Sequence, residues 1–338
     1  MNTPTVAELL AAATPVGLPM RVRFRGVEVR ETVLLHGPRG WGEFGPFPEY
    51  ADEEAAHWLA AGLEAAWGSW PQPVRDRIEV NATVPAVEPG KIAEVLAGFD
   101  GCGTVKVKVA EQGQTLHDDL ARVAEVRALL GPAAHVRVDA NGAWTVDQAR
   151  EALTRLSAYT LQYAEQPCAK VPDLARLRLQ LARDGVDVPI AADESVRRAE
   201  DPLRVAREGA ADLVVVKVAP LGGVAAALDI VREAGLPAVV SSALDSSVGI
   251  AAGVALAAAL PELDLACGLG TVGLLAADVA EHPLVPHEGV LQVADARAIV
   301  EADALTGLAA HELTGSRRQW WLDRLARCHA LTSGVTQP

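Results

Sequence analysis

The sequence has few cysteines and no apolar run long enough to cross a membrane. Its four cysteines, Cys102, Cys168, Cys267 and Cys328, include no Cys-x-x-Cys pair. Scattered thiols indicate a reducing compartment, so we expect a cytoplasmic protein without disulfides. The most apolar stretch, residues 249–260, is shorter than the roughly 20 residues that a membrane span requires. The first residues also lack the basic region of a secretory signal.

The chain also has little positive charge and no closely spaced histidines. Its 30 basic residues face 44 acidic ones, which gives a formal net charge of −14. No basic stripe interrupts this excess, so we expect neither a nucleic acid nor an acidic membrane as a partner. The histidines show no His-x-His or His-x-x-x-His spacing, which argues against a histidine zinc site. A small molecule is the expected partner, bound by a monomer or a homo-oligomer.

What the sequence does contain is a regular alternation of short apolar segments and helical stretches. Eight segments rich in Val, Ile, Leu and Ala are predicted strands: Ile78–Val84, Thr104–Val109, Val136–Asp139, Leu161–Glu165, Val188–Asp193, Leu213–Val218, Ala238–Ser242 and Leu265–Cys267. Because helical stretches separate them, the strands should lie parallel. Eight such units predict an α/β fold with a (β/α)8-type barrel, a modified TIM barrel.

The first 77 residues do not follow this alternation. Residues 20–37 predict two strands that turn at Gly26, and a helix with an acidic first turn follows from Asp52. Pro-Gln-Pro at 71–73 indicates a linker. We therefore predict an α+β capping domain over residues 1–77, to which residues 300–338 contribute a final helix. The barrel with the catalytic and metal site would span residues 78–299.

Charged residues lie at the ends of consecutive predicted strands. In chain order they are Lys106 and Lys108, then Asp139, Glu165, Asp193, and finally Lys217. Active groups of a (β/α)8 barrel lie at the C-terminal ends of its strands, so these side chains would meet at one rim. A single Asp or Lys at a strand end is more often a cap or a surface charge. That explanation does not readily account for three acids and three lysines in this order.

Three converging carboxylates repel one another unless they bind a cation. Oxygen ligands without His or Cys favour Mg2+, with Mn2+ as a possible substitute, so Asp139, Glu165 and Asp193 are the predicted metal ligands. Lys106 and Lys108 lie two apart in one strand and would both point into the barrel. Each would lower the pKa of the other, which suits a general base. Such a site favours removal of a proton next to a carboxylate.

Five motifs of the chain resemble the enolase superfamily in its muconate-lactonizing subgroup: KVK at 106–108, DAN at 139–141, EQP at 165–167, DES at 193–195 and KVAPLGG from 217. The resemblance implies Mg2+ and a lysine base. It implies that Lys108 is the base and that Lys217 stays cationic against the ring of the intermediate. Lys106 and Arg137 would adjust the field around Lys108.

Asn141 and Glu194 would support the metal ligands or cap helices. Further stretches, FRGVEVRE, GWGEFGPFPEYADEEAA and VVSSALDSSVGIAAG, resemble dehydratases of menaquinone biosynthesis within this subgroup. The likeness implies syn-dehydration of 2-succinyl-6-hydroxy-2,4-cyclohexadiene-1-carboxylate. The helix that begins near Ser246 would bind the succinyl carboxylate through its free N–H groups. Ser241, Ser242 and Gly268 are the candidate substrate-binding residues, although a simple strand-to-helix turn explains the serines equally well.

Three other functions stay open. A racemase or epimerase of N-acylated amino acids or dipeptides would use Lys108 and Lys217 from opposite faces. Such enzymes of the subgroup usually carry a longer loop between the first cap strands, for which residues 21–30 leave little room. A Schiff-base aldolase would use Lys217, which the three carboxylates disfavour. A non-catalytic metal-binding scaffold would lose no function with Lys108.

Overall fold

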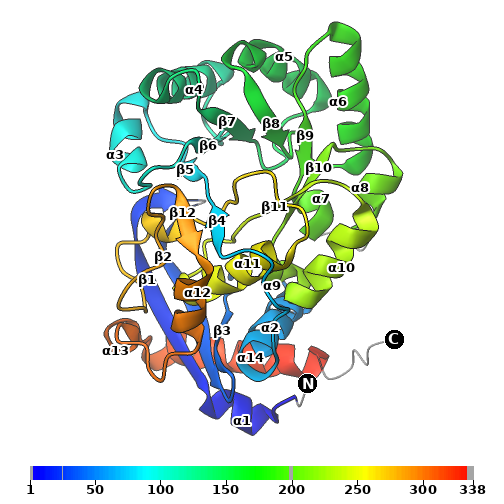
Figure 1. Ribbon diagram of the computed structural model, residues 1–338. Coiled ribbons are helices and arrows are strands. Elements are labelled where there is room, and N and C mark those ends of the chain that lie inside the picture. The colour runs from blue at the N-terminus through cyan, green and yellow to red at the C-terminus, as the bar shows by residue number, and fades with distance from the viewer. Residues whose placement is uncertain (1–2, 25, 198–200, 333–338) are drawn as a thin grey trace.

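The structure, a computed structural model, describes residues 3–24, 26–197 and 201–332. Figure 1 shows a curled sheet surrounded by helices above a smaller sheet that has helices of its own. The upper sheet has the strand order β11-β10-β9-β8-β7-β6-β5, and every pair in it is parallel. Its strands are β5 (Ala82–Val84), β6 (Thr104–Lys108), β7 (His135–Asp139), β8 (Leu161–Glu165), β9 (Ile190–Ala192), β10 (Leu213–Val216) and β11 (Ala238–Val240).

Helices that connect these strands lie on the outside of the curled sheet (Figure 1). They are α3 (Ile92–Leu96), α4 (Leu116–Leu130), α5 (Val146–Leu156), α6 (Val171–Asp184), α8 (Arg204–Arg207), α10 (Val224–Ala234) and α11 (Ser247–Ala259), with short α7 (Glu194–Arg197) and α9 (Val218–Leu221) at the strand ends. Helix α5 begins with the capping box that the sequence suggests, between Thr145 and Gln148. The expected alternation of strand and helix is therefore present, and the predicted barrel-type fold is confirmed.

Two of the eight predicted strands differ from the prediction. The segment Ile78–Val84 is divided, because β4 (Arg77–Glu79) pairs antiparallel with β12 (Val290–Gln292) and only β5 joins the parallel sheet. Residues 265–267 form no strand, and single bridges join Val80 to Cys267 and Ser241 to Gly268. These bridges still connect the two edges of the curled sheet. Gly268 directly follows this apolar run, and a glycine weakens a strand because it has no side chain to pack.

The lower part combines an antiparallel sheet with helices from both ends of the chain. Its sheet has the order β1-β2-β3, with β1 (Ala13–Phe24), β2 (Val27–Gly37) and β3 (Gly40–Phe44). Helices α1 (Val6–Ala11), α2 (Asp52–Trp67) and α14 (Gly315–Thr332) pack beside it (Figure 1). Trp58 and Leu59 of α2 and Trp321 and Leu325 of α14 are fully or almost fully buried. The expected strand pair, the acidic-start helix and the final helix are all present.

The remaining elements are η1 (Pro89–Lys91), η2 (Ser157–Tyr159), η3 (Thr271–Leu274), α12 (Val293–Val300) and α13 (Leu308–His311). Arg75 fastens the linker to the end of α11, because its guanidinium donates to the carbonyls of Ala257 and Leu260 at 2.5 and 2.6 Å. These carbonyls have no partner within the helix, so the linker supplies one. Within the described ranges, no helix is long and apolar enough to span a membrane.

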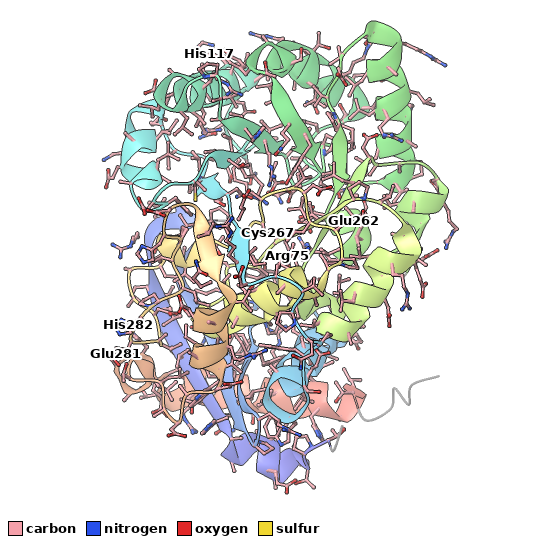
Figure 2. All side chains as sticks on the ribbon, viewed as in Figure 1. Arg75, His117, Glu262, Cys267, Glu281 and His282 are labelled. Carbon is pink, nitrogen blue, oxygen red and sulfur yellow. The ribbon has the colours of Figure 1, made fainter. Side chains whose placement is uncertain are left out.

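All four cysteines are buried and free, as the sequence predicts. Figure 2 shows Cys267 in the middle of the molecule, whereas His117 and His282 lie at separate edges. Both of these histidines are exposed. Across the described part of the chain, no group of three His, Cys, Asp or Glu side chains is spaced to hold a metal ion.

Candidate active site

The predicted acids and lysines lie at the carboxyl ends of adjacent strands. Lys108, Asp139 and Glu165 are register partners across β6, β7 and β8, so their side chains leave the sheet at one level. Asp193 directly follows β9, and Lys217 directly follows β10. All of these side chains are buried or nearly so, with Lys108 the most open at 11% exposure. A local pattern of strand ends has therefore become one cluster, because the strands are parallel and adjacent.

Lys106 and Arg137 lie one level deeper in the same two strands. The Arg137 guanidinium donates to the side chains of Gln162 at 2.6 Å and Asn81 at 3.1 Å, and to the carbonyl of Ala266 at 2.7 Å. These bonds connect β7 with β8 and with the segments that close the sheet. The groups that Arg137 bonds are all neutral parts of the barrel wall, and its effect on the field around Lys108 stays a prediction.

The lysines of β6 bind the first two carboxylates. Lys108 Nζ donates to Asp139 Oδ2 at 2.5 Å. Lys106 Nζ lies 3.0 and 3.1 Å from the two oxygens of Glu165 and 3.5 Å from Asp139 Oδ2. Val105 and Val107, which alternate with these lysines, are completely buried in the hydrophobic core. Strand parity therefore turns the lysines inward, as the sequence predicts.

The third carboxylate has a different set of partners. One oxygen of Asp193 accepts from Lys217 Nζ, and the other accepts from Arg197 Nε at 3.0 Å. The Asp193 backbone N–H donates to Gln166 Oε1 at 2.9 Å. Lys217 and Lys108 thus lie at opposite ends of the strand arc, each bonded to its own carboxylate. Arg197 is a member of this cluster that the sequence interpretation missed, although its spacing of four residues from Asp193 was visible.

Asn141 and Glu194 connect the two ends of the cluster. Asn141 Oδ1 accepts from Lys108 Nζ at 2.8 Å, and Asn141 Nδ2 donates to Glu194 Oε1 at 3.2 Å. The Asn141 backbone has φ 46°, a left-handed conformation that Asn tolerates better than most residues. In this conformation its N–H donates to Asp139 Oδ1 at 3.0 Å. Asn141 therefore contacts the predicted base and a predicted metal ligand directly, whereas Glu194 reaches them only through Asn141 and Arg197.

The cluster shifts the pKa values of its carboxylates in opposite directions. Burial opposes ionisation of Asp139, but the ammonium groups of Lys108 and Lys106 outweigh it and hold its pKa below the usual range. Burial, followed by repulsion from Asp139, raises the pKa of Glu165 from 4.5 to about 7. Burial and the neighbouring Asp139 therefore disfavour the ionised form of Glu165, and Lys106 does not offset this effect.

The pKa values of the buried lysines are also shifted in opposite directions. Burial disfavours the charged form of Lys106, but Glu165 and Asp139 outweigh it and raise its pKa. Burial lowers the pKa of Lys217, and the attraction of Asp193 does not offset it. Around Asp193 itself, Arg197 and Lys217 outweigh the effect of burial and lower its pKa to about 2.

The donor set of this cluster suits a hard divalent cation. Three buried carboxylates supply only oxygen ligands, and burial beside Asp139 disfavours the ionised form of Glu165, which a bound cation would favour. In the structure, the ammonium groups of Lys106 and Lys217 lie between the carboxylates. For this reason the described residues contain no group of three side chains that is already spaced to hold a metal ion. Asp139, Glu165 and Asp193 therefore fit Mg2+ by chemistry and position.

The cap contributes two aromatic residues to the cluster, Phe24 at the end of β1 and Tyr50 between β3 and α2. The Phe24 ring centroid lies 5.5 Å from Lys108 Nζ, a cation–π distance. The Tyr50 hydroxyl lies 3.5 Å from Arg197 Nη1. Sequence patterns give no signal for such contacts, because they join segments far apart in the chain. The strand rim is thus covered by the cap.

The expected role of the α11 N-terminus is wrong. Glu43 of β3 occupies it, because its carboxylate accepts from the N–H groups of Ser246 at 3.2 Å and Gly249 at 3.0 Å, and from the Ser246 hydroxyl. Burial, then repulsion from Asp245, raises the pKa of Glu43 to about 7. These donors are therefore satisfied within the chain and do not await a substrate carboxylate.

The candidate substrate-binding residues lie together after β11. Ser242 Oγ donates to the carbonyl of Gly268 at 2.8 Å, and Ser241 Oγ lies 3.5 Å from the same oxygen. Ser241 and Lys217 also line a small space of about 20 Å3 behind the lysine, which is about the room of one water molecule. The serine hydroxyls thus stabilise the turn that follows β11. Their contact with substrate stays a prediction.

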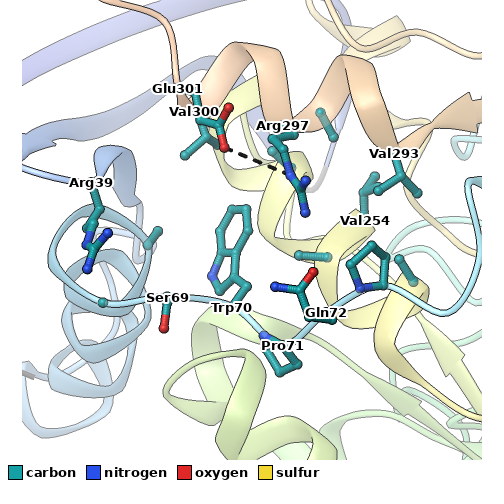
Figure 3. A pocket seen from close by; sticks show the side chains of 17 residues that line it. Arg39, Ser69, Trp70, Pro71, Gln72, Val254, Val293, Arg297, Val300 and Glu301 are labelled. Atoms are coloured by element: carbon teal, nitrogen blue, oxygen red, sulfur yellow. Dashed lines mark ion pairs between the residues drawn. The ribbon is translucent and has the colours of Figure 1, made fainter.

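A larger cavity lies away from the charged cluster. It measures about 330 Å3 and is formed by the linker at 68–73, α11 and α12. Figure 3 shows Trp70 in it, with Arg297 and Glu301 of α12 paired at 3.9 Å. None of the predicted site residues lines this cavity. Cavity size alone would therefore have pointed away from the chemistry.

Fold and site together define an enolase-like protein. Residues 91–297 match the enolase C-terminal domain-like family, and residues 16–66 match the enolase N-terminal domain-like family. Among solved structures, muconate lactonizing enzyme from Pseudomonas fluorescens complexed with muconolactone has a TM-score of 0.71 at 22% identity, covering 92% of this chain and 97% of that one. The L-Ala-D/L-Glu epimerase from Bacillus subtilis has a TM-score of 0.69 at 22% identity, covering 83% and 94%. These likenesses show the fold.

The sequence relatives are more specific. The chain is 57% identical to o-succinylbenzoate synthase of Mycolicibacterium smegmatis, over 98% of this chain and 99% of that protein. It is 55% identical to o-succinylbenzoate synthase of Mycobacterium marinum, over 97% and 96%. The chain belongs to the o-succinylbenzoate synthase family of enolase-like proteins.

Proposed function

We propose that this chain is an o-succinylbenzoate synthase, a dehydratase of menaquinone biosynthesis. It removes water from 2-succinyl-6-hydroxy-2,4-cyclohexadiene-1-carboxylate and forms o-succinylbenzoate. Identity of 54–57% over nearly the whole chain supports this function. The structural observation that carries it is the pair of lysines at the two ends of a carboxylate arc, Lys108 on Asp139 and Lys217 on Asp193.

Asp139, Glu165 and Asp193 would hold Mg2+, for which Mn2+ is a possible substitute. Enzymes of the enolase superfamily combine a lysine or histidine base with Mg2+. When bound, the ion stabilises the negative charge that develops on the substrate carboxylate. The three side chains suit this role because they are buried, acidic and adjacent.

Lys108 is the proposed base. It removes the proton next to the carboxylate, and the electron pair of that C–H bond is delocalised onto the carboxylate. This electron pair then returns to form the new ring double bond and expels the hydroxyl group at the neighbouring carbon, while Lys108 returns the proton to it and water departs. One lysine serving both steps acts on one face of the ring, which gives syn elimination. Neutral Lys108 is restored at the end.

Lys106 is unsuited to this role, and Lys217 is proposed to act as a cation in the dehydration. Lys106 stays protonated, because Glu165 and Asp139 raise its pKa, so it acts as a fixed positive charge. Lys217 lies at the opposite end of the arc, where its ammonium group can face the ring of the intermediate. Phe24, close to Lys108, helps to exclude water from the base. Contact of Ser241, Ser242 and Gly268 with the substrate remains part of this proposal.

An assay of the purified protein with the cyclohexadiene acid tests the proposal. Turnover to o-succinylbenzoate should be rapid with Mg2+, should cease with EDTA, and should return when Mg2+ is added again. No turnover under any of these conditions would refute the dehydratase assignment. Turnover that survives EDTA would refute the metal assignment alone.

A second candidate function is racemisation of N-acylated amino acids, the alternative that the arrangement of the lysines favours. Two lysines on opposite sides of one site can also exchange the α-proton of an amino acid from both faces. Incubation with an N-succinyl amino acid in D2O measures this activity. Rapid α-deuteration without turnover of the cyclohexadiene acid would make racemisation the main function.

A further inference from the structure

Arg197 is a buried arginine of the cluster to which the proposed reaction gives no role. It is the last residue of α7, the short helix directly after Asp193, and its side chain is 2% exposed. On a helix, residues three and four apart lie on one side. The Arg197 guanidinium is therefore directed back to Glu194 and Asp193.

Each donor group of Arg197 has its own partner. Nε donates to Asp193 Oδ1 at 3.0 Å, Nη2 to Glu194 Oε1 at 2.7 Å, and Nη1 lies 3.5 Å from the Tyr50 hydroxyl. A planar guanidinium holds these donors at fixed angles, which a lysine ammonium cannot do. The bond to Oδ1 fixes the Asp193 carboxylate plane and leaves Oδ2 to Lys217.

The partners of Arg197 continue to the other lysine. Glu194 Oε1 also accepts from Asn141 Nδ2 at 3.2 Å, and Asn141 Oδ1 accepts from Lys108 Nζ at 2.8 Å. A line of hydrogen bonds therefore runs from Lys217 through Asp193, Arg197, Glu194 and Asn141 to Lys108. Arg197 stands in the middle of this line, and Tyr50 joins it to the cap.

We propose that Arg197 is a positioning residue that holds Lys108 and Lys217 in place together through one hydrogen-bonded line. The inference rests on the proposed function, because these lysines are its reacting groups. An arginine that only stabilised the local fold would need to bind only one of the two carboxylates, Asp193 or Glu194. Arg197 instead joins a predicted metal ligand to the residue that orients Asn141, and neutralises both.

The substitution Arg197→Lys tests this role, because it keeps the charge and removes the fork. Loss of such an outer partner typically lowers activity or metal affinity about 10–100-fold. We expect kcat to fall by that factor, KM to change little, and Mg2+ affinity measured by calorimetry to fall about tenfold. The matched control is Arg178→Lys, because Arg178 makes a comparable fork with Asp212 outside the cluster. The control should change neither quantity.

A double variant tests whether Arg197 acts on both lysines. Asn141→Ala interrupts the line between Glu194 and Lys108, so Arg197→Lys should cost less kcat in that background than in the wild type. Losses that simply multiply would overturn the joint role. Values of kcat and Mg2+ affinity within twofold of wild type in Arg197→Lys would overturn the proposal altogether.

Two further measurements keep the outcomes separate. If Arg197→Lys does not fold, Glu194→Gln removes the charge on the second partner while it keeps an oxygen for Asn141. It should lower kcat at least severalfold, and an unchanged kcat overturns the proposal. If the wild type does not turn over the cyclohexadiene acid, the proposed function fails. The Mg2+ titration of Arg197→Lys still decides whether Arg197 fixes Asp193.

Discussion

The molecule contains two groups of buried acids with different kinds of partner. At the strand rim, Asp139, Glu165 and Asp193 are bonded to lysine and arginine side chains. Between cap and barrel, Glu43 and Glu64 are bonded to backbone N–H groups at the starts of α11 and α10. Side-chain ammonium groups can leave a carboxylate during a reaction, whereas backbone N–H groups at a helix start are fixed.

Glu64 shows this second kind of partner clearly. Its two oxygens accept from the N–H groups of Val224 at 2.5 Å and Ala225 at 3.0 Å. Helix starts at the rim of a barrel ordinarily offer N–H groups to anionic ligands. Here the cap supplies the anions itself, so these helix starts join cap to barrel. Burial alone therefore does not identify a catalytic acid, because acids with side-chain partners and acids with backbone partners are both buried.

The largest expected effect is the loss of Lys108. The substitution Lys108→Met should lower kcat about 10²–10⁴-fold, because it removes the general base. Melting temperature should change little, and Lys91→Met, at a lysine side chain that is 68% exposed, is the matched control. Steady-state kinetics and thermal melting measure both. Retention of kcat within tenfold would show that Lys108 is not the general base.

Mg2+ binding should separate the two groups of acids. Asp193→Asn removes a proposed ligand and should weaken Mg2+ binding by at least about 100-fold, beyond the effect of losing an outer partner. Glu43→Gln should leave Mg2+ affinity unchanged, because its carboxylate is held at the α11 N-terminus. Calorimetric titration measures both variants. Equal losses of Mg2+ affinity in the two variants would show that the two groups of acids do not differ in metal binding.

The pH dependence of stability tests Glu43. Its folded pKa of about 7 lies above the usual 4.5, so the folded protein binds more protons than the unfolded chain between these values. The contribution of Glu43 is therefore fully present below about pH 4.5 and is lost as pH rises through about 7. Glu43→Gln should gain stability relative to wild type from about pH 5 to pH 8, by at most about 3 kcal/mol. Urea unfolding measures the difference, and a difference independent of pH would contradict it.

The smallest expected effect is at Glu64. Glu64→Gln should lower the free energy of unfolding by about 1–2 kcal/mol, because the amide has only one oxygen for the two N–H groups that the carboxylate binds. The loss of charge itself adds little, because burial raises the pKa of Glu64 and disfavours its ionised form. Activity should change little. Glu151→Gln, at an exposed glutamate of α5, is the control, and urea unfolding measures both. A loss of stability no larger than that of Glu151→Gln would show that the contact of Glu64 with the start of α10 does not stabilise the protein.

Local patterns were enough to predict much of the fold and the charged cluster. Apolar segments at βα spacing gave the strand order, and the two-residue spacing of Lys106 and Lys108 gave their direction, because strand geometry depends on neighbouring residues only. The prediction failed at residues 265–267, where closure of the sheet uses single bridges. It failed also at α11, where a carboxylate from β3 takes the N–H groups that were expected for substrate.

The sequence by itself determined which residues end the barrel strands, and so which acids and lysines meet at one rim. It determined this because parallel strands of similar length place their carboxyl ends together. Only the tertiary structure decided which cation faces each carboxylate. It also decided that Arg197 joins Asp193 to Glu194, and that Glu43 and Glu64 seal two helix starts. Those contacts depend on distances between segments far apart in the chain, which no local spacing encodes.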